Sequence, residues 1–336
     1  MHTAVLGAGA WGTTLADLLS RKGVETRLLA READVVQSIT GQNENTAFLP
    51  GVKLSPKLFS SSDPAQVLTG AAVILVVIPS QFLRVSLKSL RHLLPERPVI
   101  VCASKGIELD TLEPMSVVVE EALAGLEPRY AVLSGPSFAY EVSQNMPTSV
   151  TLGCADRDLG RELQAHFSTP NFRVYTTPDF RGVELGGAVK NVMAIAAGIS
   201  DGLGFGHDAR AALITRGLAE MSRLGVAMGA RAETFMGLSG MGDLVLTCTG
   251  DLSRNRQVGL KLGQGMKLSE IIAGARTVAE GVKTTQSVFD LSKKLGVELP
   301  ITEQVHSILY EDKDPALAVR DLMTRSLKNE HGEESF

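Results

Sequence analysis

A short apolar segment near the start of the chain leads directly into a glycine-rich turn. Residues 2–6 read HTAVL and residues 7–12 read GAGAWG, which is the spacing G-x-G-x-x-G. In this spacing Gly7 permits a tight turn, Gly9 lets a phosphate approach the bare backbone, and Gly12 lets a helix pack closely on the strand. The first amides of that helix would then face the phosphates. The turn therefore predicts a dinucleotide-binding site.

The residues after this turn decide between a phosphate site and a purely structural turn. With 33 glycines in 336 residues, the spacing also arises by chance. Leu15, Leu18 and Leu19 give the next segment one apolar face. Gly23 can end that helix, and residues 24–29 read as a second strand. The order strand, turn, helix, strand favours the dinucleotide site.

The end of the second predicted strand bears on which dinucleotide is bound. A site specific for NAD usually carries Asp or Glu there, whereas this chain reads Leu29-Ala30-Arg31-Glu32. The Arg31 guanidinium can meet a 2′-phosphate with two hydrogen bonds, and Glu32 begins a helix. Alternatively, Arg31 is a solvated loop cation. We expect NAD or NADP as cofactor, with NADP at least accommodated.

Composition limits the remaining classes. A length of 336 residues suggests two domains, and a net charge of −4 argues against nucleic-acid binding. The apolar run at 71–79 is too short to cross a membrane, and a strand starting at residue 2 leaves no room for a signal peptide, so we expect a cytoplasmic protein without membrane insertion. Cys102, Cys154 and Cys248 lack metal-ligand spacing, so no metal is expected; Cys248 is also weighed as a nucleophile, without an obvious base.

The first half of the chain alternates apolar strand-like segments with helical stretches. The later strand candidates are residues 73–77, 99–103, 130–133, 150–152 and 173–175. This alternation is typical of a doubly wound α/β sheet. After residue 177 strand-like runs vanish, and residues 179–199 read as one long helix. We predict a dinucleotide-binding domain at 1–178, an all-α substrate domain at 179–328, and a mobile tail at 329–336.

Ligands of such sheets gather at the carboxyl ends of the strands, which draws attention to three predicted loops. They span residues 78–81, 104–106 and 134–137. Lys105, beside a glycine, can reach a carbonyl or phosphate oxygen, and Gly135 and Ser137 offer backbone and hydroxyl donors. The alternative is that Lys105 is a solvated turn lysine and that Gly135 only shapes a turn.

The helical half holds candidates for acid–base chemistry and anion binding. Lys190 lies among small residues, so it either extends to solvent or is desolvated, which would lower its pKa. Asp243, in the glycine-rich segment 240–243, can orient such a lysine or cap a helix. The segment 253–256, Ser-Arg-Asn-Arg, combines guanidinium groups with a helix start, which indicates an anion site or simply a polar helix start.

Several motifs in one order resemble the NAD(P)-dependent sn-glycerol-3-phosphate dehydrogenases of bacterial type. They are the segments 7–13, 45–54, 79–81, 104–108, 134–139, 188–195, 240–243, 246–249, 253–256 and 278–284. The match covers nearly the whole chain. The resemblance implies an α/β Rossmann-type doubly wound sheet followed by an all-α helical domain. It also implies reversible reduction of dihydroxyacetone phosphate for glycerophospholipid synthesis, and a homodimer.

The resemblance also assigns roles to residues. Lys190 would donate and accept the proton, with Lys105 and Asp243 as the other catalytic residues. Substrate contacts would come from Lys105, Gly135, Ser137, Lys190, Asp243, Ser253, Arg254 and Asn255. Cofactor contacts would come from Gly7, Gly9, Ala10, Trp11, Gly12, Arg31, Lys105, Ala139, Arg254, Val278 and Glu280. Many members carry Ser where this chain has Ala10, so a backbone amide must serve there.

Two other classes remain open at this point. A β-hydroxyacid dehydrogenase also joins a Rossmann domain to a helical domain with a catalytic lysine, but it acts on a carboxylate. A nicotinamide-binding redox sensor or scaffold would need no lysine, aspartate and arginine in its second domain.

Overall fold

The structure, a computed structural model, describes residues 2–273, 279–327 and 329–330. Its first half is one sheet with strand order β3-β2-β1-β4-β5-β6-β7-β8. The strands are β1 (His2–Leu6), β2 (Thr26–Leu29), β3 (Phe59–Ser61), β4 (Ala71–Val76), β5 (Val99–Cys102), β6 (Arg129–Ser134), β7 (Thr148–Gly153) and β8 (Phe172–Thr177). All pairs are parallel except β6 with β7. The predicted doubly wound sheet is confirmed.

Helices cover both faces of this sheet. They are α1 (Ala10–Lys22), α2 (Ala33–Gln42), α3 (Pro64–Leu68), α4 (Ser80–Leu90), η1 (Arg91–Leu93), α5 (Met115–Ala122), α6 (Ala139–Ser143) and α7 (Arg157–Phe167). Successive residues of β1 enter opposite cores, since Val5 packs with the apolar residues of α1, α2 and α7, whereas Ala4 and Leu6 pack with those of α3, α4 and α5. Because the strands are buried on both faces, they read as continuous apolar runs.

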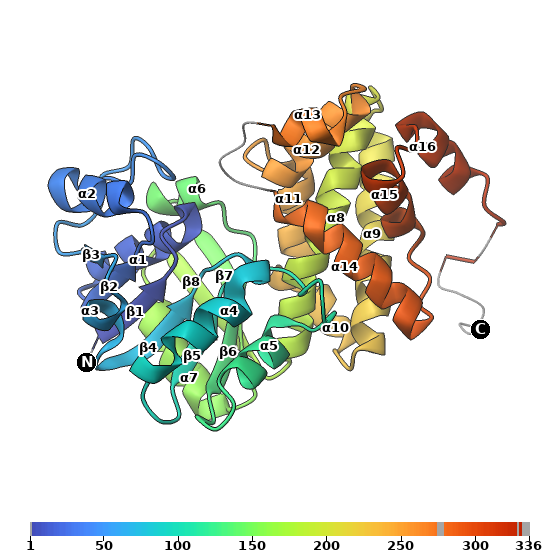
Figure 1. Cartoon of the computed structure of the whole chain (residues 1–336). Coiled ribbons are helices and arrows are strands. Elements are labelled where there is room, and N and C mark those ends of the chain that lie inside the picture. Colours follow the sequence, from blue (N-terminus) through green and yellow to red (C-terminus); the bar gives the residue numbers. More distant parts are fainter. Residues whose placement is uncertain (1, 274–278, 328, 331–336) are drawn as a thin grey trace.

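The second half is built around one central helix, α8 (Phe180–Gly202), whose residues 182–200 are all buried. Its partners are α9 (His207–Ala227), α10 (Ala232–Phe235), η2 (Leu238–Gly242), α11 (Asp243–Thr249), α12 (Arg254–Gly263), α13 (Leu268–Ile272), α14 (Glu280–Leu295), α15 (Pro300–Tyr310) and α16 (Pro315–Met323). Figure 1 shows the sheet half and the helical half side by side, and α8 packs on β6 and β7 as well as on its helical partners. Within the described residues only Phe180–Gly202 is long and apolar enough to cross a membrane, and the burial of its residues 182–200 identifies it as a core helix.

Two details of the sheet differ from what the sequence suggests. The three-residue edge strand β3 went unpredicted because FSS is too short to show an alternating pattern. The strand segments at 150–152 and 173–175 are present, but β7 runs antiparallel to β6. β8 ends at Thr177 and α8 begins at Phe180. The division at 178/179 stays a prediction, and the proposed tail falls largely outside the described residues.

Candidate active site

The glycine-rich turn leaves bare backbone exposed above the start of α1. Gly7 has φ +111°, and a Cβ at Gly12 would lie 1.9 Å from the Gly7 carbonyl oxygen, so both positions require glycine. A Cβ at Gly9, in contrast, would meet nothing within 4 Å. Gly9 caps α1 without a side-chain hydrogen bond, so the first amides of α1, that of Ala10 included, are free for an anion.

A second observation supports a ligand at this turn. The Nε1–H of Trp11 is buried and has no hydrogen-bond partner in the part of the chain that the structure describes. A buried donor without a partner is costly unless a bound group accepts from it. Ala139, at the start of α6, lies nearby, because its carbonyl oxygen accepts a hydrogen bond from Thr14 Oγ1 of α1 at 3.2 Å. These residues therefore fit the pyrophosphate of a dinucleotide.

Arg31 stands at the carboxyl end of β2 beside the turn. Its side chain is 91% exposed, and its Nε and Nη2 donate to Glu32 Oε1 at 3.1 and 2.8 Å. Arg31 is thus solvated, as one of the two interpretations expected, but its guanidinium group already pairs with the carboxylate of Glu32. An exposed pair of this kind adds little stability, so the guanidinium remains available to a competing 2′-phosphate.

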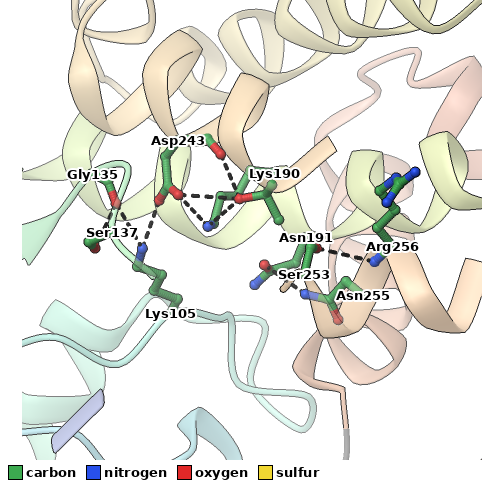
Figure 2. A network of polar contacts seen from close by, with 10 residues as sticks. Lys105, Gly135, Ser137, Lys190, Asn191, Asp243, Ser253, Asn255 and Arg256 are labelled. Carbon is green, nitrogen blue, oxygen red and sulfur yellow. Dashed lines mark hydrogen bonds and ion pairs between the residues drawn. The ribbon is translucent and has the colours of Figure 1, made fainter. Parts of the chain in front are cut away.

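The centre of the candidate site joins three charged side chains from distant segments, as Figure 2 shows. Lys190 Nζ of α8 donates to Asp243 Oδ1 at 2.5 Å and to Thr247 Oγ1 at 2.7 Å. Lys105 Nζ donates to Asp243 Oδ2 at 2.7 Å. Both lysines thus share one carboxylate that is only 1% exposed. The alternatives of an extended Lys190 and a helix-capping Asp243 are wrong, since Lys190 is buried and Gly242 caps α11.

Burial sets the protonation of this cluster. It lowers the pKa of Lys190 to about 8; Asp243 opposes the shift and the charge of Lys105 adds to it. Burial alone would raise the pKa of Asp243, yet the two ammonium groups hold it below its usual value. With both lysines protonated the cluster carries one net positive charge. It is therefore suited to an oxygen that becomes negative during a reaction.

A tight turn after β6 borders the cluster. Gly135 has φ +147°, and a Cβ there would lie 2.9 Å from the Cα of Val150, so only glycine fits. Its carbonyl oxygen accepts from Ser137 Oγ at 3.0 Å and faces Lys105 Nζ at 3.5 Å. The structure thus brings Gly135 and Ser137, from the predicted loop at 134–137, beside Lys105, from the predicted loop at 104–106.

Helix α12 approaches the cluster from the other side. Ser253 caps it and accepts from the Arg256 amide at 3.2 Å. Asn255 Nδ2 donates to Asn191 Oδ1 at 2.9 Å, which ties α12 to the residue after Lys190. Arg254 is exposed, whereas the second arginine of the motif, Arg256, is held by Asp201 and Asp251 in ion pairs. Of the two arginines in this motif, Arg254 is therefore the one whose guanidinium fork has no ion-pair partner within the described residues.

The remaining sequence candidates have different outcomes. Glu280 begins α14, and burial raises its pKa although the positive charge of Arg254 opposes the shift. Val278 lies outside the described residues. Cys248 is fully buried, and burial raises the pKa of its thiol to about 12, so the nucleophile interpretation is wrong.

Three contacting residues were missed in the sequence. Thr247 lies four residues after Asp243, which places both on one face of α11, and this spacing was a usable signal. Asn191 carries no signal beyond its position next to Lys190. Gln81 was noticed only as part of a motif, and its contacts depend on the folded loop at 104–109.

Comparisons with known proteins agree with this architecture. The family described as NAD-dependent glycerol-3-phosphate dehydrogenase N-terminus matches residues 2–160, and its C-terminus counterpart matches residues 179–320. A relative from Maridesulfovibrio salexigens named glycerol-3-phosphate dehydrogenase [NAD(P)+] is 67% identical over 98% of this chain and 100% of its own. The crystal structure of glycerol-3-phosphate dehydrogenase from Coxiella burnetii, 42% identical, superposes with a TM-score of 0.92 over 96% of this chain and 98% of its own.

Proposed function

Because this chain belongs to the family of NAD-dependent glycerol-3-phosphate dehydrogenases, we propose that it reversibly reduces dihydroxyacetone phosphate to sn-glycerol 3-phosphate with NADH or NADPH. The observation that carries the proposal is the buried Lys105–Asp243–Lys190 cluster beside the exposed start of α12. A reduced nicotinamide, when bound, supplies a hydride to the substrate ketone. The residues of the chain supply the proton, the charge and the orientation.

Lys190 acts as the proton donor and acceptor. As an ammonium group it gives a proton to the C2 oxygen during reduction, and as an amine it takes the hydroxyl proton in reverse. A pKa of about 8 keeps both forms accessible near neutral pH. Asp243 fixes the direction of the Lys190 Nζ, and Lys105 adds positive charge where negative charge develops on the oxygen.

The substrate phosphate binds at the start of α12. Arg254 and Asn255 grip its oxygens, and the capped end of α12 at Ser253 adds amide donors. This remote binding energy orients the ketone for transfer. Gly135 and Ser137 contact the rest of the substrate beside Lys105.

The cofactor occupies the turn between β1 and α1. Gly7, Gly9 and Gly12 shape the bare backbone, and the amides at Ala10 and Trp11 meet the pyrophosphate. Arg31 reaches the ribose side. The other cofactor contacts come from Lys105 and Ala139 in the sheet half, from Arg254 and Glu280 in the helical half, and from Val278.

The cellular setting and the domain division are proposed on the sequence patterns and on the resemblance. The enzyme works in the cytoplasm as a homodimer, and its product enters glycerophospholipid synthesis. Its two domains divide at 178/179, and its substrate domain extends to residue 328.

The decisive test mixes the purified protein with dihydroxyacetone phosphate and follows absorbance of the reduced nicotinamide, once with NADH and once with NADPH. We expect rapid oxidation with at least one cofactor, and little with dihydroxyacetone, which lacks the phosphate that Arg254 binds. Turnover of a β-hydroxyacid instead would favour the carboxylate-specific class. Cofactor binding without turnover of either substrate would favour a redox sensor.

The Arg31→Ala variant tests the cofactor's ribose site. We expect kcat/KM with NADPH to fall about 10-fold relative to that with NADH, because only NADPH offers a 2′-phosphate to the guanidinium. Arg27→Ala is the matched control, since Arg27 lies on β2, four residues before Arg31, and also pairs with a neighbouring glutamate, Glu25. An equal loss with both cofactors in Arg31→Ala would exclude a 2′-phosphate contact.

A further inference from the structure

The position of Lys105 depends on the loop at residues 104–109, which several segments hold: the Ser104 hydroxyl donates to the Ile78 carbonyl oxygen, and the Glu108 amide donates to that of Glu113. Lys105 lies three residues after Cys102, the last residue of β5, and its terminal Nζ contacts Asp243. The loop, residues 104–109, runs across the first turn of α4. The residues at the start of α4 that bond to its backbone therefore contribute directly to its placement.

Gln81, in the first turn of α4, holds this backbone with both ends of its side-chain amide. Its Nε2 donates to the Ile107 carbonyl oxygen at 2.8 Å, and its Oε1 accepts from the Leu109 amide at 3.0 Å. The two bonds clamp the loop on either side of Glu108. A side-chain amide is well suited to this task because it carries a donor and an acceptor on one rigid plane.

Neighbouring contacts restrict the loop further without replacing this clamp. Ser287 of α14 also donates to the Ile107 carbonyl oxygen, at 3.0 Å. Arg84, one helical turn after Gln81, forms an ion pair with Glu108 at 2.7 Å. A Cβ at Gly106 would lie 2.4 Å from Ser80 Oγ, so the loop is seated directly on α4. Gln81 is the one residue among these that fixes the loop at two backbone positions.

We propose that Gln81 is a positioning residue that holds the 104–109 loop so that the Lys105 ammonium group reaches Asp243. The proposal gives the motif at 79–81 a role apart from the substrate and cofactor contacts. The claim that Gln81 positions Lys105 depends only on the contacts of this chain. The expected effect on kcat/KM rests on the proposed function.

If Lys105 leaves its place beside Asp243, the pKa of Lys190 changes. Lys190 Nζ faces Asp243 and Thr247, both on α11, as well as Lys105 across the carboxylate and the buried Cys248. The charge of Lys105 lowers the pKa of Lys190, and Lys105 also shares Asp243 with it. When Lys105 moves away, Asp243 pairs with Lys190 alone. The pKa of Lys190 then rises above about 8.

The test is the Gln81→Met variant, which keeps the length of the side chain but removes both hydrogen bonds. We expect kcat/KM for dihydroxyacetone phosphate to fall between about 10- and 100-fold, because a small misplacement of a catalytic group has effects of this size. We also expect the pH at which the reduction rate declines to move upward. In a crystal structure of the variant, Lys105 Nζ is expected beyond hydrogen-bond distance of Asp243 Oδ2.

Gln164→Met is the matched control, because Gln164 of α7 also donates to a backbone carbonyl, that of Val174 in the edge strand β8, at 2.8 Å. It is expected to lose stability similarly and to keep the wild-type pH profile. An unchanged Lys105–Asp243 contact in the Gln81→Met crystal structure overturns the proposal, whether or not the enzyme acts on dihydroxyacetone phosphate. An unshifted pH profile together with a loss no larger than that of the control also overturns it. A wild-type protein without turnover refutes the proposed function and leaves the crystallographic test decisive.

Discussion

The Lys190→Ala variant is expected to lose about 10²- to 10⁴-fold in kcat while binding NADH as tightly as the wild type. The loss is large because Lys190 is the buried group that we propose as the proton donor, and general acid catalysis contributes rate factors of this size. NADH binding persists because Lys190 lies on α8, away from the turn between β1 and α1. Steady-state kinetics and fluorescence titration of NADH measure the two quantities separately.

The pH profile of the wild type adds an independent check on this assignment. If Lys190 donates the proton, it must be protonated for reduction, so the reduction rate is expected to decline as the pH rises through about 8. The reverse oxidation needs the neutral amine and rises through the same pH. Both limbs are expected to vanish in Lys190→Ala. Near-normal turnover in this variant, or a retained limb near pH 8, would show that another group transfers the proton.

Local patterns in the sequence were enough to predict the dinucleotide turn. Gly7 and Gly12 are needed for reasons confined to a few neighbouring residues, a positive φ and a close contact with the adjacent backbone. Their spacing therefore appears directly in the sequence. The same holds for Ser253, whose capping of α12 depends only on the residue three positions later.

The residues of the lysine–aspartate cluster could be proposed from the sequence, but their meeting in space could not be predicted from it. The cluster joins the loop after β5, which carries Lys105, with α8, which carries Lys190, and α11, which carries Asp243. These side chains meet only because the helical half packs on the sheet. Their residue types alone left both structural and functional interpretations open. Burial excludes the solvated interpretation of Lys190, because a lysine enclosed with a carboxylate cannot be a surface group.

Other contacts were missed because they depend on how the chain folds and leave no pattern in the sequence. The clamp of Gln81 on Ile107 and Leu109 requires the loop already to lie on α4. The pairing of Arg31 with Glu32 is local, yet two adjacent residues of opposite charge need not interact, so the sequence did not predict it.

The Gly259→Ala variant is expected to lower the free energy of unfolding by about 3 kcal/mol and to raise the KM for dihydroxyacetone phosphate. Helix α12 crosses α8 with their backbones in contact, and a Cβ at Gly259 would lie 2.0 Å from the Ile195 carbonyl oxygen. The reciprocal glycine on α8, Gly198, faces the Arg256 carbonyl oxygen at the same distance. Because backbone atoms form the contact, no side-chain rotation relieves it. Urea unfolding measures the loss.

Gly41→Ala is the matched control, since Gly41 also lies inside a helix, α2, but a Cβ there meets nothing within 4 Å. It is expected to stabilise the protein by about 0.5 to 1 kcal/mol, because alanine loses less backbone entropy on folding. The KM increase in Gly259→Ala follows from geometry, since Arg254 and Asn255 lie on the same helix, five and four residues before the crossing, and move with it. A destabilised variant with an unchanged KM would show that the start of α12 is held by Asn191 and Gly281, which bond to Asn255, rather than by the crossing.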